Sequence, residues 1–214
     1  MTKVKLVGKV LKKEADMLTV ETLAVGRDGV EYRDQYDVHA TGKSPKVGTN
    51  VAVIGVTAYD QEDGTVWIEA TKPIVETDEP STNLAKAEGE AVGVFQFFER
   101  NDDKKSFGNG LIKTEDGWQR GVAFGYLAHK LDKKFRNGAL VKLAGRLRKQ
   151  VYERNGDERE IFEIVLDPNG TKILKPAPDG DAYDFDDEAP KSKLAKIVRR
   201  IGQKIDDMPA PAAM

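Results

Sequence analysis

Short runs of alternating apolar and polar residues recur along most of this chain, with glycine-containing turns between them. Such runs occupy residues 4–7, 50–54, 65–68, 140–143 and 160–166. A two-residue period is typical of a strand that buries one of its faces. Dipeptides that favour tight turns between strands occur at Asp28-Gly29, Asp63-Gly64, Asp116-Gly117, Asn137-Gly138, Asn155-Gly156 and Asn169-Gly170. The sequence therefore predicts an all-β main body.

Glycine positions indicate an internal repeat. Gly48 and Gly55 recur as Gly138 and Gly145, at an offset of 90 residues. Two further matches, at offsets of 85 and 92 residues, are the run 6–10 with the run 91–95 and Gly64 with Gly156. Recurring offsets of this kind predict two copies of one small β-module.

Each copy contains about five predicted strands in roughly 80–90 residues, which is typical of a Greek-key barrel of the OB type. We expect one barrel over residues 1–78, a polar linker broken by Pro80 over 79–87, and a second barrel over 88–176. The expected fold is thus two tandem five-stranded OB-type barrels.

One helical pattern interrupts the strands of the second module. Leu127, Leu131 and Phe135 follow an i, i+4, i+8 spacing, and Asn137-Gly138 ends the pattern. An OB barrel has its helix between the third and fourth strands, which is where this segment lies. The corresponding segment of the first module, residues 41–46, is short and includes a proline, so we expect no helix there.

The last segment, residues 177–214, differs in character from the modules. Residues 179–188 contain six acidic side chains and no basic one, which predicts a disordered acidic tail. Past Pro190, apolar residues at helical spacing lie among six lysines and arginines over 191–205. This second part predicts a short cationic amphipathic helix.

The composition argues against several functional classes. The chain has no cysteine and two histidines, His39 and His129, which excludes disulfide scaffolds, cysteine nucleophiles and zinc ribbons. No Gly-x-Ser-x-Gly motif occurs, and the acidic residues lie mostly in turns or in the tail. We therefore expect no enzyme activity, no cofactor and no metal site. Without a run of 18 apolar residues we expect no membrane segment, and a cytoplasmic location fits the absence of cysteine.

Charge is unevenly distributed along the chain. Residues 1–83 carry 10 basic and 14 acidic groups, a net charge of −4, whereas residues 84–175 carry 18 and 14, a net charge of +4. Residues 176–214 carry 6 and 8, a net charge of −2. The basic second module points to a polyanionic partner.

Aromatic and basic residues are interleaved between positions 91 and 166. Binding of single-stranded nucleic acid needs this combination, because cations contact the phosphates while exposed rings stack on unpaired bases. We expect Phe95, Phe135 and Phe162 to lie in the barrel core. Trp118 and Tyr152 have polar and basic neighbours, so we expect both rings at the surface.

The order of motifs over residues 118–166 resembles that of the bacterial-type single-stranded DNA-binding proteins. A tryptophan opens a strand that ends in Phe-Gly-x-Leu-Ala, a helix follows, and Gly-x-Leu-Arg then leads to an aromatic residue and a turn. In this chain these motifs are Trp118, Phe124-Gly125 with Leu127-Ala128, Gly145-Arg146-Leu147-Arg148, Tyr152 and Asn155-Gly156. The resemblance implies an OB fold that binds single-stranded DNA without sequence preference and protects replication, recombination and repair intermediates.

The resemblance also implies which residues bind. Base stacking is expected from Trp118, Phe124 and Tyr152, with Tyr152 standing where tryptophan is more usual, and from Phe107 in the preceding strand. Basic candidates for phosphate contacts are Arg120, Arg146, Arg148, Lys149, Arg154, Lys104, Lys105 and Lys113.

Members of this family recruit replication and recombination proteins through an acidic tail that ends in Ile-Pro-Phe. This chain has the acidic run but departs at the tip, where Asp206-Asp207-Met208-Pro209 replaces that ending. We expect a homo-oligomer, with a dimer favoured. Replication or recombination proteins are the expected class of partner at the tail. The extra module and the basic tail helix suit a phage or plasmid member, which would act in the host cytoplasm.

Two alternatives remain open for the whole chain and two for the first module. The chain could instead be an OB-type protein-interaction adaptor, or it could bind single-stranded RNA. The first module could be a structural or dimer-forming barrel, or it could be a second DNA site. Candidate contacts for that second site are Tyr32, Tyr36, Tyr59, Trp67 and the lysines at positions 3, 5, 9, 12 and 13.

Overall fold

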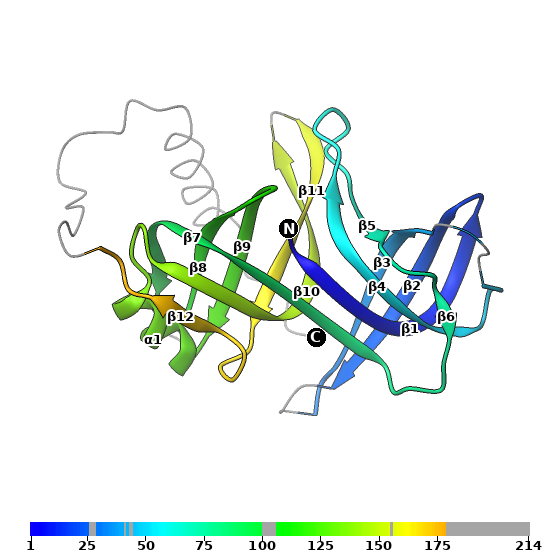
Figure 1. Cartoon of the computed structure of the whole chain (residues 1–214), viewed down its shortest axis with the longest axis horizontal. Coiled ribbons are helices and arrows are strands. Elements are labelled where there is room, and N and C mark those ends of the chain that lie inside the picture. The colour runs from blue at the N-terminus through cyan, green and yellow to red at the C-terminus, as the bar shows by residue number, and fades with distance from the viewer. Residues whose placement is uncertain (26–28, 41, 43–44, 100–105, 155, 179–214) are drawn as a thin grey trace. The chain divides into compact units, whose positions relative to one another are not determined.

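The computed structural model describes residues 1–178, apart from 26–28, 41, 43–44, 100–105 and 155 (Figure 1). The acidic run over 179–188 and the expected amphipathic helix over 191–205 therefore lie outside the described residues. In the described part, β-strands form almost all of the regular structure.

Five strands close the first barrel. They are β1 (Lys3–Glu14), β2 (Met17–Val25), β3 (Glu31–His39), β4 (Asn50–Tyr59) and β5 (Val66–Ala70). Their order is β1-β2-β3-β5-β4, and β4 returns to pair with β1. The β3–β5 pair is parallel and the others are antiparallel. A short strand, β6 (Val75–Glu76), adds to the edge of β4.

The second barrel repeats this topology. Its elements are β7 (Thr82–Phe98), β8 (Phe107–Thr114), β9 (Gly117–Phe124), α1 (Tyr126–Lys134), β10 (Leu140–Arg154), β11 (Asp157–Leu166) and β12 (Lys172–Lys175). The order β7-β8-β9-β11-β10 closes with β10 on β7, β9–β11 is the parallel pair, and β12 adds to β10. The prediction of an all-β chain with two five-stranded OB-type barrels is confirmed.

The helix also lies where the sequence placed it. α1 connects the third and fourth strands of the second barrel, and it buries Leu127, Ala128 and Leu131. Phe135, just past its end, is fully buried, and Phe95 and Phe162 are also buried, as expected. Between β3 and β4 of the first barrel, the described residues contain no helix.

The structure corrects one part of the internal repeat. Gly48 donates its N–H to the Val10 carbonyl at 2.8 Å, and Gly138 donates to the Ala91 carbonyl at 2.9 Å. Val10 therefore corresponds to Ala91, an offset of 81 residues rather than the expected 85. The physical reason is that an alternating pattern still matches after a shift of two or four residues. Pairing with the fourth strand, which the sequence does not display, sets the true register.

The equivalent glycines are Gly8 and Gly89. They stand opposite Val51 and Val141 in the two fourth strands. A Cβ on Gly8 would lie 2.1 Å from the Glu21 carbonyl oxygen, and one on Gly89 would lie 2.2 Å from the Lys113 carbonyl oxygen. Both positions need glycine because the adjacent backbone passes too close for a side chain.

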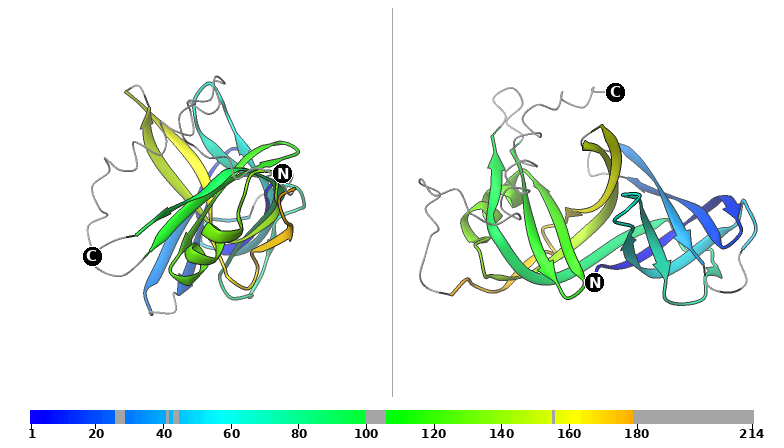
Figure 2. Two further views of the ribbon diagram at one scale, coloured as in Figure 1. Left: turned by 90° about the vertical axis from the view of Figure 1, so that its left-hand side faces the viewer. Right: turned by 90° about the horizontal axis from the view of Figure 1, so that it is seen from above.

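The expected linker over 79–87 differs from what the structure shows. β7 begins at Thr82, and its first residues pair with β1, from Val7 opposite Thr82 to Lys3 opposite Lys86 (Figures 1 and 2). Further along, β7 pairs with β10. One long strand thus belongs to both barrels, and their strands form a continuous hydrogen-bonded sheet. No helix in the described residues is long and apolar enough to cross a membrane.

Candidate nucleic-acid interface

Strand pairing places most of the predicted site residues on one face of the second barrel. Residues directly opposite each other in paired strands point to the same face. Phe107 lies opposite Phe124, and Lys113 lies opposite Trp118, in the β8–β9 pair. The intervening Gln119 and Ala123 are buried on the other face. The outer face of β8 and β9 therefore carries both predicted stacking rings of β9.

Three phenylalanines form a row at one end of this face. Phe98 lies opposite Phe107, which lies opposite Phe124, across β7, β8 and β9. The rings of Phe98 and Phe107 are stacked, with centroids 5.0 Å apart and planes 20° apart. Phe124 is 51% exposed, and the neighbouring Tyr126 is 80% exposed. This end of the face presents aromatic surface to solvent.

Trp118 lies at the other end of the same strand. It is 45% exposed, as the sequence predicted, and it is directly opposite the exposed Lys113. Val122, between Trp118 and Phe124 on this face, is buried. Exposed rings therefore occur at two separate places along β9, one beside a lysine.

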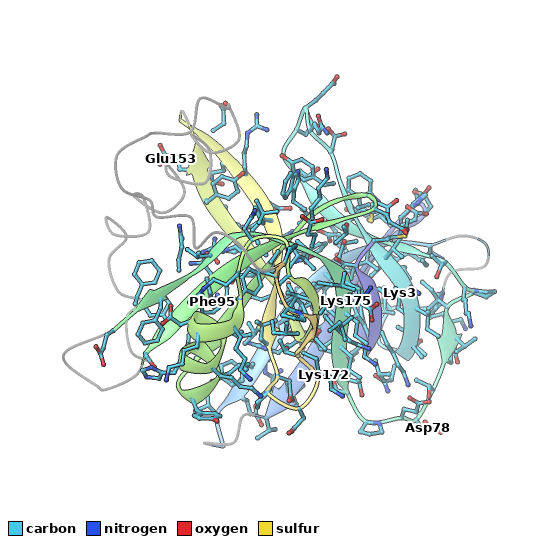
Figure 3. All side chains as sticks on the ribbon, turned by 60° about the vertical axis from the view of Figure 1, so that its left-hand side comes forward. Lys3, Asp78, Phe95, Glu153, Lys172 and Lys175 are labelled. Atoms are coloured by element: carbon cyan, nitrogen blue, oxygen red, sulfur yellow. The ribbon has the colours of Figure 1, made fainter. Side chains whose placement is uncertain are left out.

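The face continues onto the β10–β11 hairpin. Glu163 of β11 stands opposite Arg120 of β9 and also opposite Arg148 of β10. By alternation, Tyr152 lies on this face too, opposite Arg159. Tyr152 is half-buried rather than fully exposed. Glu153, which follows it, marks the outer part of this hairpin in Figure 3.

A buried carboxylate holds two of the predicted cations. Glu163 is fully buried, and Arg148 donates to its Oε1 from Nε at 2.6 Å and also from Nη2. Arg120 Nε lies 3.8 Å from Glu163 Oε2 on the opposite side. Burial lowers the pKa of Arg120, and the charge of Glu163 opposes that shift. Glu163 is thus an internal counter-ion shared by two guanidinium groups: it is hydrogen-bonded to Arg148, whereas Arg120 Nε and Glu163 Oε2 have no hydrogen-bond partner.

Two further predicted cations pair with carboxylates of the first barrel. Arg146 Nη1 lies 2.8 Å from Asp34 Oδ2, and its guanidinium covers the Tyr32 ring at 4.5 Å. Lys149 Nζ lies 2.8 Å from Glu160 and 3.3 Å from Asp37. Burial lowers the pKa of Lys149, but its two carboxylate partners outweigh burial and raise it.

The predicted residues therefore fall into three groups. The face over β8, β9 and the β10–β11 hairpin brings together the residues Phe107, Lys113, Trp118, Arg120, Phe124, Arg148 and Tyr152. Arg146 and Lys149 lie on β10 but contact the first barrel. Lys104, Lys105 and the side chain of Arg154 lie outside the described residues.

Sequence reasoning did not single out two aromatic residues at or beside this face. Phe98 and Tyr126 belong to the interleaved aromatic region, but no motif marked them as binding residues. For Tyr126, its place directly after Phe124-Gly125 was an available signal. For Phe98, the decisive observation is its partner in β8, which only the structure supplies.

The first barrel offers less as a stacking surface. Tyr36 is fully buried, and that burial raises the pKa of its hydroxyl. Arg146 lies over the Tyr32 ring, which is 38% exposed, and Lys5 pairs with Glu79 at 2.9 Å. Tyr59 remains 46% exposed. Within the part of the chain that the structure describes, no group of three or more His, Asp or Glu side chains is placed to hold a metal ion.

Comparison with known proteins yields no matching family model. Among solved structures, the wild-type single-stranded DNA binding protein from Thermus aquaticus is similar, with a TM-score of 0.64 and 13% identity. The match covers 85% of this chain and 96% of that protein, so it includes both barrels. A deletion mutant of the same protein matches with a TM-score of 0.60 and 13% identity, over 86% of this chain and 98% of that one. As its motifs predicted, the chain has the OB fold of the single-stranded DNA-binding proteins.

Proposed function

We propose that this chain binds single-stranded DNA without sequence preference, by stacking bases on the exposed rings of the second barrel. The observation that carries the proposal is the face shared by Trp118, Phe124 and Phe107, on which the Trp118 and Phe124 rings are open to solvent and Trp118 lies opposite Lys113. Stacking tolerates every base because each has a π-face, and phosphate contacts are equally independent of sequence. The similar solved structures are of proteins named for binding single-stranded DNA.

The proposed role is protective rather than catalytic. A coated single strand is shielded during replication, recombination or repair, and such shielding needs affinity without chemistry. The guanidinium group of Arg148 suits this task, because its hydrogen bonds to Glu163 hold it in place before DNA arrives. Preorganised contacts lose less entropy on binding.

Replacement of Trp118 by alanine tests the proposal most directly. Stacking on one aromatic ring contributes about 1–3 kcal/mol per base, so affinity for a labelled oligo-dT should fall by roughly 5- to 150-fold. Tyr152→Ala should act in the same direction. Tyr59→Ala is the matched control, because Tyr59 has the same exposure, 46% against 45%, but lies on the first barrel.

The same titration separates the alternatives. Fluorescence anisotropy should be followed with oligo-dT, oligo-rU and duplex DNA of equal length. Tight binding of oligo-dT alone supports the proposal, and tighter binding of oligo-rU would make the chain an RNA-binding protein. No binding of any nucleic acid would favour the interaction adaptor. Equal losses in Trp118→Ala and Tyr59→Ala would refute the assignment of the site to the second barrel.

We further propose that the chain self-associates and that residues 177–214 contact replication or recombination proteins. The six acidic residues within 179–188 support the second point, because a block of like charges is typical of a segment that contacts partners. Sedimentation of the chain gives its mass in solution. Comparing partner capture by the full chain with capture by a chain ending at residue 176 tests the tail.

A further inference from the structure

The outer part of the β10–β11 hairpin extends beyond the sheet of its own barrel. In the described residues, β7 pairs with β10 as far as Gly145, and β9 pairs with β11 over Glu163–Val165. Residues 146–162 therefore form a two-stranded arm, which carries Tyr152. A two-stranded hairpin by itself is at best marginally stable in water. Some other part of the chain must hold this arm in place.

The first barrel contacts the outer part of the arm through the turn between β4 and β5. Glu160 donates its backbone N–H to the Gly64 carbonyl at 2.7 Å. Val66 donates its N–H to Glu160 Oε2 at 3.2 Å, and Arg159 Nη1 donates to the Gln61 carbonyl at 3.1 Å. Figures 1 and 2 show the hairpin beside the first barrel. The hairpin is thus bonded to a turn about 95 residues away in sequence.

The inner part of the arm contacts β3 of the first barrel. Tyr36 donates its hydroxyl to the Leu147 carbonyl at 2.5 Å. Asp34 and Asp37 form the ion pairs with Arg146 and Lys149 described above. Acidic residues of the first barrel thus stabilise this contact, because the carboxylates of β3 pair with basic side chains of the arm.

From these contacts we infer that the first barrel is a positioning domain for the arm. It holds the arm so that Tyr152 and Arg148 remain on the face that includes Trp118. This inference rests on the proposed function and gives the first barrel its role in it. An arm held in its binding position costs less entropy to engage DNA. Loss of this positioning should weaken the contacts between the arm and DNA while leaving the contacts between β9 and DNA intact.

Gly64→Ala is the primary test. Gly64 has a φ of +68°, and a Cβ there would lie 2.8 Å from Cγ of Arg159. Gly48→Ala is the matched control, since Gly48 also has a positive φ, +90°, but nothing lies within 4 Å of its added Cβ. Both variants carry similar backbone strain. Only Gly64→Ala presses on the arm.

Two readouts are compared in these variants. Affinity for oligo-dT should fall roughly 2- to 12-fold in Gly64→Ala relative to Gly48→Ala, as expected for losing a preordered group. In double-mutant cycles, Gly64→Ala should reduce the effect of Tyr152→Ala and leave that of Trp118→Ala unchanged. Equal affinity in the two glycine variants, or full additivity with Tyr152→Ala, would overturn the inference.

Amide hydrogen exchange of the free protein provides a test that needs no DNA. Exchange over residues 146–162 should accelerate in Gly64→Ala but not in Gly48→Ala, because local opening follows loss of supporting contacts. Unchanged exchange would refute the positioning role even if the chain binds DNA. Conversely, failure of the wild-type chain to bind oligo-dT, together with this exchange difference between the two variants, would refute the proposed function alone.

A second variant approaches the same contact from the arm, in case Gly64→Ala does not fold. Glu160→Ala removes the acceptor of the Val66 N–H and one partner of Lys149. Glu158→Ala, two residues away and exposed, is its control. The exchange and affinity differences expected for Gly64→Ala should recur in Glu160→Ala and be absent from Glu158→Ala.

Discussion

Replacing Asn83 with alanine should destabilise both barrels, because its side chain makes hydrogen bonds to β10 at a point where the backbone of β7 no longer pairs with β10. The pairing of β7 with β10 ends at Ala85 opposite Gly145, and the residues of β7 that precede Ala85 pair with β1 alone, with Asn83 opposite Leu6. The side-chain amide of Asn83 replaces the backbone as the partner of β10. The Leu147 N–H donates to Asn83 Oδ1, and Asn83 Nδ2 donates to the Leu147 carbonyl, both at 3.0 Å.

The magnitude follows from which groups lose their partners. Asn83 is 8% exposed and Leu147 is fully buried, so the Leu147 N–H would be left unsatisfied at a cost of about 1–3 kcal/mol. The Leu147 carbonyl keeps the Tyr36 hydroxyl as donor. Loss of the remaining Nδ2 hydrogen bonds, which include one to Tyr36 at 2.7 Å, adds about 1 kcal/mol. The total is a loss of about 2–4 kcal/mol in the free energy of unfolding.

Urea unfolding monitored by tryptophan fluorescence measures this effect separately in each barrel. Trp67 lies in β5 and Trp118 in β9, so Trp67→Phe and Trp118→Phe backgrounds each leave one reporter. Both reporters should show the same shift. Asn137→Ala is the control, because Asn137 is exposed and accepts one hydrogen bond, from Gly93 N–H at 2.9 Å. A loss no larger than that of Asn137→Ala, or a shift seen by one reporter alone, would contradict this account of Asn83.

Three further predictions concern binding and pH. Tyr126→Ala should weaken oligo-dT binding by about 1–3 kcal/mol without changing the urea midpoint, since the side chain is 80% exposed; wild-type affinity would remove Tyr126 from the site. Lys113→Gln should reduce the slope of log affinity against log salt by about 0.7, the value for one phosphate contact on a single strand. Arg146→Gln should change that slope less, because Asp34 already neutralises Arg146; equal slopes in the two variants would contradict this. Hydrogen bonds to Asp16 and Glu69 raise the pKa of His39 above 6.5, so its stabilising contribution is full below pH 6.5 and is lost as the pH rises through the folded-state pKa. Unfolding measured at pH 6 and pH 8 should therefore show a smaller difference in Asp16→Asn than in wild type, and an equal difference would exclude His39 as the cause.

Local features of the sequence were sufficient to predict the strands, the helix and the fold class. Alternation sets which residues of a strand can face a core, and Leu127, Leu131 and Phe135 share one helix face whatever surrounds them. The motif order from Trp118 to Tyr152 was specific enough to indicate the OB fold. These properties depend on residues close together in the chain, so they are visible before folding is considered.

Partner choice between strands was not visible in the same way. Every residue has a backbone carbonyl acceptor, and every residue except proline has an N–H donor, so nothing in residues 82–86 shows that they pair with β1. The shift of register between Val92 and Gln96 in the β7–β8 pair was likewise not visible in the sequence. Without it, Phe98 would stand opposite residue 105, whereas the observed register places it on Phe107 and creates the aromatic row.

The electrostatic environment of the candidate site was also decided by tertiary structure. The sequence shows that arginines alternate with Leu147 on β10 and that an aromatic residue ends that run. It did not determine that Arg146 meets Asp34, 112 residues away, or that Glu163 is buried between Arg148 and Arg120. A charge acts through space and not along the chain. Only the folded arrangement of both barrels could therefore decide which cations have internal partners and which, like Lys113, face solvent beside an exposed ring.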